Sequence, residues 1–118
     1  MKISFASTDG VHVNQHFGWC DTFYMYEVNE EGYHFIKELD ASLKLEDEID
    51  KLEYKINSLE DSDIVCVLQI GPKASTMVQK SGIYPMSSNE ENIEYVITKI
   101  QKMMRENPPL WLKRILLK

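Results

Sequence analysis

Three side chains of the kinds that bind metals or act as nucleophiles recur at every fourth position near the start of the chain: His12, His16 and Cys20. This spacing does not match a structural zinc site, in which short Cys or His pairs close a set of four ligands. Two imidazoles and a thiol on one loop could still hold an open metal site, because imidazole suits zinc, copper, iron and nickel and thiolate suits iron–sulfur species. The spacing therefore allows metal chemistry without selecting a metal.

Two other interpretations of these residues stay open at this point. In the first, they have structural roles only, with His12 exposed, His16 hydrogen-bonded within the loop and Cys20 a small buried side chain. In the second, Cys20 is a nucleophile and His16 is its base. The sequence offers only Asp9 or Asp21 as the third, orienting group of such a site.

A second segment carries groups that suit an anion. Gly71-Pro72-Lys73-Ala74 begins a predicted helix, with proline at its first position. The first turn of a helix has free backbone N–H groups and the positive end of the helix dipole, which favour a negatively charged ligand. The ammonium group of Lys73 could add a full positive charge there.

The elements that position these two segments follow from the hydrophobic pattern. Residues 22–28 are rich in aromatic side chains and residues 64–70 are almost entirely apolar, as expected of strands. Between residues 45 and 59, apolar side chains recur at spacings of four and three, which predicts a helix whose acids and lysines face water. The full prediction is strands at residues 2–7, 22–28, 33–39, 64–70 and 83–86, and helices at 45–59, at 72–80 and from the capping-box spacing of Ser88 and Glu91 to residue 106.

The order of these elements predicts an α/β fold. Three consecutive strands with short connections should form an antiparallel meander, and the later strand–helix–strand units should add parallel strands through right-handed crossovers. The result is a mixed five-stranded sheet flanked by helices, with strands in the order 3-2-1-4-5 and the second strand antiparallel. Ligands of such sheets bind outside the carboxyl ends of the parallel strands. We therefore expect the loop at residues 8–20 to meet the segment at residues 71–74.

Length and charge limit the classes of function. With 118 residues, the chain is expected to form a single α/β domain at residues 1–106, followed by an apolar, basic tail at residues 107–118. The excess of 19 acidic over 13 basic residues gives a net charge of −6, which disfavours nucleic-acid binding. The longest apolar run is far shorter than the ~20 residues of a membrane span, and no signal peptide is recognisable. We expect a cytoplasmic protein with reduced thiols, and neither a nucleic acid nor a membrane as partner.

The tail has its own pattern. Two apolar triplets, Leu110-Trp111-Leu112 and Ile115-Leu116-Leu117, flank Lys113 and Arg114. A short amphipathic segment of this kind could cover the sheet of its own domain, dock on a partner or touch a membrane surface. With three charges in nine residues, it would be a poor membrane anchor.

Residues 7–19, Ser-Thr-Asp-Gly-Val-His-Val-Asn-Gln-His-Phe-Gly-Trp, resemble the signature of the nitrogenase cofactor-binding family, which includes NifX, the core domain of NafY and the carboxyl-terminal domain of NifB. Three further segments agree with this resemblance. Residues 53–56 resemble the family's KLxxKI helix, and residues 63–71 resemble the strand and Ile-Gly turn that follow it. Residues 107–112 resemble the NPPxWL tail typical of NifX. The similarity covers nearly the whole chain.

The resemblance implies a ribonuclease H-like, three-layer α/β fold with a mixed five-stranded sheet. It also implies an accessory carrier and not an enzyme, which transiently binds iron–sulfur precursor clusters or the iron–molybdenum cofactor. The partners it implies are nitrogenase cofactor assembly proteins, namely NifB, a NifEN-type scaffold and apo-dinitrogenase. The alternative is a metal-free interaction module or a regulator of nitrogenase assembly that acts through its tail.

The resemblance further implies roles for individual residues. The favoured cluster ligand of the family is the histidine of a His-Phe-Gly motif, which is His16 here, and His12 occupies the other histidine position of the loop. Cys20 departs from the family pattern, which commonly has alanine there, and could be an added thiolate ligand or merely a small residue. We expect the metal to be bound by His16 and Cys20, and the cofactor as a whole by His16, His12, Cys20, Asn14 and Lys73.

Overall fold

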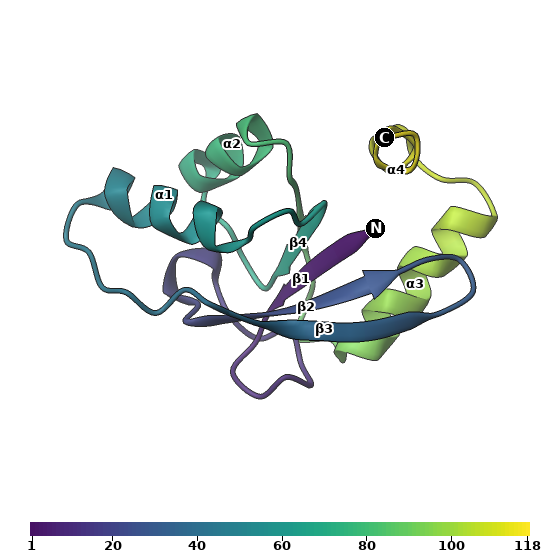
Figure 1. The fold of residues 1–118 in the computed structure, drawn as a ribbon, viewed down its shortest axis with the longest axis horizontal. Coiled ribbons are helices and arrows are strands. Elements are labelled where there is room, and N and C mark those ends of the chain that lie inside the picture. Colours follow the sequence, from purple (N-terminus) through teal and green to yellow (C-terminus); the bar gives the residue numbers. More distant parts are fainter.

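The centre of the molecule is a mixed five-stranded sheet (Figure 1). Its strands are β1 (Lys2–Ala6), β2 (Thr22–Val28), β3 (Tyr33–Asp40), β4 (Ile64–Val67) and β5 (Tyr84–Ser87). They lie in the order β3-β2-β1-β4-β5, with β2 antiparallel to both of its neighbours and β1, β4 and β5 parallel. This computed structural model describes all residues from 1 to 118. The predicted strand order and strand directions are confirmed.

Helices cover both faces of this sheet. They are α1 (Glu48–Ser58), α2 (Pro72–Lys80), α3 (Ile93–Arg105) and α4 (Leu110–Leu116). Figure 1 shows α1 and α2 on one side of the sheet and α3 on the other. Alternate side chains of each strand supply the two cores: Val65 and Val67 pack toward α1 and α2, whereas Ile64 and Cys66 pack toward α3.

Only the first four residues of the apolar run at 64–70 form a strand, although the sequence predicts a strand over the whole run. The backbone N–H of Leu68 donates to the carbonyl of Gln15 at 2.9 Å, and the carbonyl of Gln69 accepts from the N–H of Phe17 at 2.9 Å. The chain beyond β4 therefore pairs with the loop that follows β1. This pairing ties the two predicted segments together at the carboxyl end of the sheet.

Two predicted helix starts are wrong because other side chains cap the helices. The predicted helix at 45–59 begins only at Glu48, since the carboxylate of Asp47 accepts from the N–H of Asp50 at 2.9 Å. The predicted capping box at Ser88 also fails, because Asn92 caps α3 by accepting from the N–H of Glu94 at 2.8 Å. The Ser88 hydroxyl instead donates to the Glu91 carboxylate within the preceding turn.

The tail packs on its own domain. Leu112 is fully buried in the core that β1 shares with α3. The indole of Trp111 stacks on the phenol ring of Tyr84 in β5, with ring centroids 3.8 Å apart and planes inclined by 4°.

No helix of the structure is both long and apolar enough to cross a bilayer.

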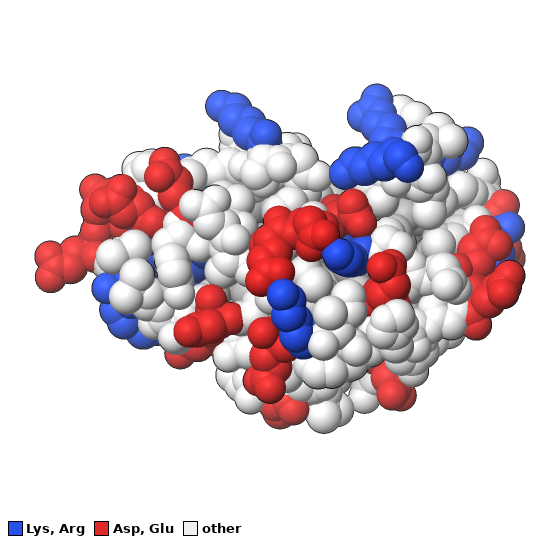
Figure 2. All heavy atoms as spheres, viewed as in Figure 1, with Lys and Arg blue, Asp and Glu red and all other residues white.

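Charge is unevenly distributed over the surface. Figure 2 shows acidic side chains scattered across the visible face, whereas basic side chains stand up from α2 and α4 at the top. The basic residues of these helices are Lys73 and Lys80 in α2 and Lys113 and Arg114 in α4. An acidic chain thus still presents local positive surfaces.

Candidate functional site

The first half of the loop after β1 is held by a hydrogen-bond network around Asp9. The Asp9 carboxylate accepts from the backbone N–H groups of Val11 and His12 at 2.8 and 2.9 Å, and its second oxygen lies 3.0 Å from Nδ1 of His12. The bond to the His12 ring is the main reason that the pKa of Asp9 lies well below its usual value. Gly10 has φ +72°, and a Cβ there would lie 2.9 Å from the Tyr24 ring. This half of the loop is therefore built for rigidity.

Asn14 closes the neck of the same loop. Its Oδ1 accepts from the N–H of Thr8 at 3.0 Å, and its Nδ2 donates to the Thr8 hydroxyl at 2.8 Å. The neighbouring N–H of Val13 donates to the carbonyl of Glu91 at 2.9 Å, which ties the loop to the start of α3. The structure thus gives both polar groups of the Asn14 side chain a bond within the loop.

His16 begins the second half of the loop and lies at the carboxyl end of the sheet. It forms a parallel bridge with Gln69, and the fully buried Phe17 ring anchors the residue that follows it. The His16 imidazole stacks on the Trp19 indole, with ring centroids 4.7 Å apart and planes inclined by 17°. Trp19 itself is 67% exposed, so this aromatic pair stands at the surface.

A cavity of about 620 Å³ opens beside this pair, within the size range of small-molecule sites. It lies outside the ends of β4 and β5, where open α/β sheets bind ligands. We call it the His16 cavity; its walls are His16, Gly18, Trp19, Glu48, Lys51, Leu68, Gln69, Ile70, Gly71 and Ser87. The predicted meeting of the two loops is confirmed, because His16 and Gly71 share this cavity.

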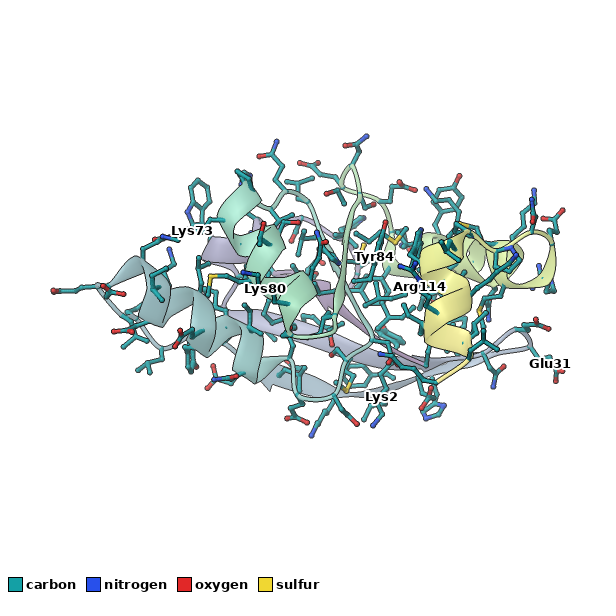
Figure 3. The ribbon with its side chains drawn as sticks, turned by 90° about the horizontal axis from the view of Figure 1, so that it is seen from above. Lys2, Glu31, Lys73, Lys80, Tyr84 and Arg114 are labelled. Carbon is teal, nitrogen blue, oxygen red and sulfur yellow. The ribbon has the colours of Figure 1, made fainter.

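Of the five residues expected to bind cofactor, the structure places only His16 in the wall of this cavity. His12 is half exposed and pairs with Asp9 near the start of α3. Lys73 is exposed in the first turn of α2, as Figure 3 shows, and it does not line the cavity. The imidazole of His16 is thus the one predicted group that a ligand in the cavity can reach.

Cys20 lies behind the loop and not at the cavity. It is fully buried in the core under α1, and its Sγ donates to the carbonyl of Thr22 at 2.9 Å. Burial raises the pKa of the Cys20 thiol to about 11. The structure does not bring this thiol together with the His16 ring, and no three His, Cys, Asp or Glu side chains gather to hold a metal ion.

Two residues that the sequence analysis did not select are part of the site. Lys51 lines the His16 cavity and has no ion-pair partner, and its Nζ lies 3.8 Å from where a Cβ on Gly18 would be. Trp19 stacks on His16 as described above. The sequence did contain a signal for Lys51. Glu48, Lys51 and Lys55 are spaced three and four residues apart, so they lie on one face of α1.

The comparison with known proteins identifies the family. A profile of the family described as Dinitrogenase iron-molybdenum cofactor matches residues 1–103. Protein NifX of Herbaspirillum seropedicae is 30% identical over 121 residues, an alignment that covers 100% of this chain and 83% of that protein. Protein NifX of Azotobacter vinelandii is 31% identical, with 97% of this chain and 73% of that protein covered.

Solved structures show the same fold. The crystal structure of PH0822 matches with a TM-score of 0.70 at 18% identity, covering 94% of this chain and 99% of that chain. A Methanocaldococcus jannaschii protein described as a candidate dinitrogenase matches with a TM-score of 0.64 at 13% identity, covering 88% and 90%. The profile match, and a similarity to NifX that extends over nearly all of this chain, show that the chain belongs to the Dinitrogenase iron-molybdenum cofactor family.

Proposed function

We propose that this chain is a carrier in nitrogenase cofactor assembly, which holds an iron–sulfur precursor cluster or the iron–molybdenum cofactor in the His16 cavity. Membership of the family supports the role in cofactor assembly. The observation that carries the choice of site is the His16 imidazole, which lines an open cavity at the carboxyl end of the sheet. The carrier would act in the cytoplasm, between NifB, a NifEN-type scaffold and apo-dinitrogenase.

The chemistry of the site suits a cargo that must be released. A single imidazole supplies one strong bond to iron or another transition metal, and a closed set of four protein ligands would hold the cluster too firmly to hand it on. The cargo is anionic and the chain has a net charge of −6, so attraction must come from local groups. Lys51, which forms no ion pair, supplies a positive charge in the cavity wall, and the carboxylate of Glu48 in the same wall offsets part of it. His12, Asn14 and Lys73 stay outside the set of direct ligands in this proposal.

Cys20 follows a 3₁₀ turn at Phe17–Trp19 and could join the cargo only if that turn opened. Its thiol would have to leave the core and lose its bond to the carbonyl of Thr22. The same burial opposes an enzyme in which Cys20 is the nucleophile, because the raised pKa leaves almost no thiolate near neutral pH. We therefore propose His16 as the protein's ligand and Cys20 as a core residue.

The proposal is tested by an anaerobic titration of the full chain with isolated cofactor precursor, followed by gel filtration and counting of co-eluting iron and molybdenum. We expect stoichiometric co-elution with the native chain and its loss with His16→Ala. His34→Ala is the matched control, because His34 is exposed on β3, an edge strand far along the sheet order from β4. Equal binding by native chain and His16→Ala would overturn the assignment.

A second function is supported by the exposed part of the tail. Leu110 and Leu117 of the tail are 63% and 85% exposed, beside Lys113 and Arg114. An interaction module would use this surface and bind no cluster. The Leu110→Ser/Leu117→Ser double variant separates the two functions: a carrier retains cluster binding, whereas an interaction module loses its capture of assembly proteins.

A further inference from the structure

A second cavity, of about 250 Å³, adjoins the His16 cavity and shares Gly18, Trp19 and Lys51 with it. We call it the lysine cavity. Its walls hold three lysines and three large apolar side chains, and no acidic residue lines it. These residues are Lys44, Lys51, Lys55, Trp19, Leu43 and Leu45.

Lys55 is the unusual member of this set. The sequence pattern predicts that the lysines of α1 face water, but Lys55 is only 2% exposed. Its ammonium group donates to the carbonyl of Cys20 at 2.5 Å and to the carbonyl of Ala41 at 3.0 Å. An ammonium group has three donors, so one N–H of Lys55 has no partner in the protein. A buried cation with an open donor is costly unless an acceptor meets it.

The other two lysines, Lys44 and Lys51, add positive charge to the wall of the same cavity. Lys51 has no carboxylate within ion-pair distance. Lys44 pairs with Asp21 at 2.6 Å, but both side chains are more than half exposed, so this pair is weak and can rearrange. In a chain of net charge −6, three ammonium groups around one cavity without a carboxylate in its wall form a local site for an anion.

The size and the apolar walls narrow the class of anion. A cavity of about 250 Å³ corresponds to roughly eight water volumes at about 30 Å³ each. That space has room for a small organic anion such as a short dicarboxylate. Leu43, Leu45 and Trp19 would contact its methylene groups, which a bare phosphate or sulfate lacks. We propose that the lysine cavity binds a short aliphatic dicarboxylate, with its carboxylates at Lys55 and Lys51.

This site does not depend on the proposed cluster cargo, because none of its lysines is a metal ligand and its ligand contains no metal. Trp19 and Lys51 line both cavities, so occupancy of one cavity should alter affinity in the other. Binding of the dicarboxylate would then change the affinity of the His16 cavity for its own ligand.

The test is isothermal titration calorimetry of the metal-free full chain with glutarate at constant ionic strength. Glutaramide serves as the uncharged analogue and inorganic phosphate as the oxyanion without methylene groups. We expect glutarate to bind with one site per chain, glutaramide not to bind, and phosphate to bind more weakly. Lys51→Gln should weaken glutarate binding about tenfold, as expected for one lost charged hydrogen bond.

Lys102→Gln is the matched control, because Lys102 is an exposed lysine on α3, on the other face of the sheet, and it should bind glutarate as the native chain does. Absence of glutarate binding by the native chain would overturn the proposal. Equal affinity of native chain and Lys51→Gln would also overturn it, and so would phosphate binding as tightly as glutarate. Because no cluster is present, none of these outcomes bears on the proposed cargo of the His16 cavity.

Discussion

The imidazole of His16 and the indole of Trp19 lie nearly parallel, with their centres 4.7 Å apart. The stack fixes one face of the imidazole, and its ring edge stays available at the cavity. Because the indole is 67% exposed, it contributes little to the core. We therefore infer that the stacking orients the His16 ring and adds little to the stability of the fold.

This relationship predicts the effect of Trp19→Ala. The variant should unfold within about 0.5 kcal/mol of the native chain, because an exposed side chain is removed. It should nevertheless release bound cluster faster, because the imidazole loses the ring that holds its orientation. The measurement is the rate of cluster transfer to a chelator. An unchanged rate would show that the stack has no part in holding the cargo.

The same pair predicts an optical signal for binding. The chain has two tryptophans, and only Trp19 lines the His16 cavity. Cluster binding should quench Trp19 emission, because the indole contacts the imidazole that we propose as the ligand. In Trp19→Phe the remaining emission comes from Trp111, which stacks on Tyr84, and it should change little on binding. Equal quenching in both proteins would place the cargo elsewhere.

Cys20 predicts a chemical test of the loop. Since burial raises the pKa of its thiol to about 11, about one molecule in a thousand carries the thiolate at pH 8. Iodoacetamide should modify Cys20 slowly in the native protein and rapidly in urea, as followed by peptide mass spectrometry. Cys20→Ala should bind cluster within about twofold of the native chain. Loss of binding in that variant would mean that the turn opens and the thiol joins the cargo.

Asp9 predicts how stability depends on pH. Its pKa in the folded protein is lowered, first by the bond to the His12 ring and then by backbone N–H groups, relative to about 3.9 in an unfolded chain. As the pH falls, the unfolded state takes up the proton first, so the stabilisation by Asp9 is fully present above about pH 4 and is lost progressively as the pH falls toward the lower pKa of the folded state. Urea unfolding should show the native chain more stable than Asp9→Asn at pH 6, with the difference narrowing as the pH is lowered below about 4. Asp21→Asn, which removes a surface carboxylate, should show no comparable change.

Trp111 predicts what the tail contributes to stability. Trp111→Ala removes the ring stacked on Tyr84 and should lower the free energy of unfolding by about 2 kcal/mol, less than for a fully buried aromatic residue. Figure 3 shows Tyr84 and Arg114 close together beside α4, far from Lys73 at the start of α2. Cluster binding should therefore survive in the folded fraction of this variant. Leu117→Ala, at an 85% exposed position, should cost less than about 0.5 kcal/mol.

The sequence was sufficient to predict the strand order of the sheet, because the signals for strands and turns are local and recur along the chain. The apolar run at Ile64–Val67 and the short connections between the first three strands specify strand order through general rules of chain connection. The same rules placed His16 at the carboxyl end of the sheet. The helix starts at Asp47 and Asn92 were missed because several residues near each start can cap a helix, and the local backbone decides which one does.

The side chains of the site were harder to predict because their direction depends on a short turn. The 3₁₀ turn at Phe17–Trp19 directs His16 and Trp19 outward and Cys20 into the core, and no periodic pattern encodes that choice. Lys55 was expected to face water, but its ammonium group donates to the backbone carbonyls of Cys20 and Ala41. Both cases depend on contacts between distant segments, which spacing along one segment does not reveal.

The most direct test of the account is whether a nitrogen of His16 is bonded to the cluster. The full chain, labelled with ¹⁵N-histidine, would be loaded anaerobically with cofactor in a paramagnetic state and studied by pulsed electron paramagnetic resonance. We predict a histidine nitrogen coupling that changes with the isotope, persists in His12→Ala and His34→Ala, and disappears in His16→Ala. A coupling that persists in His16→Ala, or a bound cluster without any histidine coupling, would contradict the account.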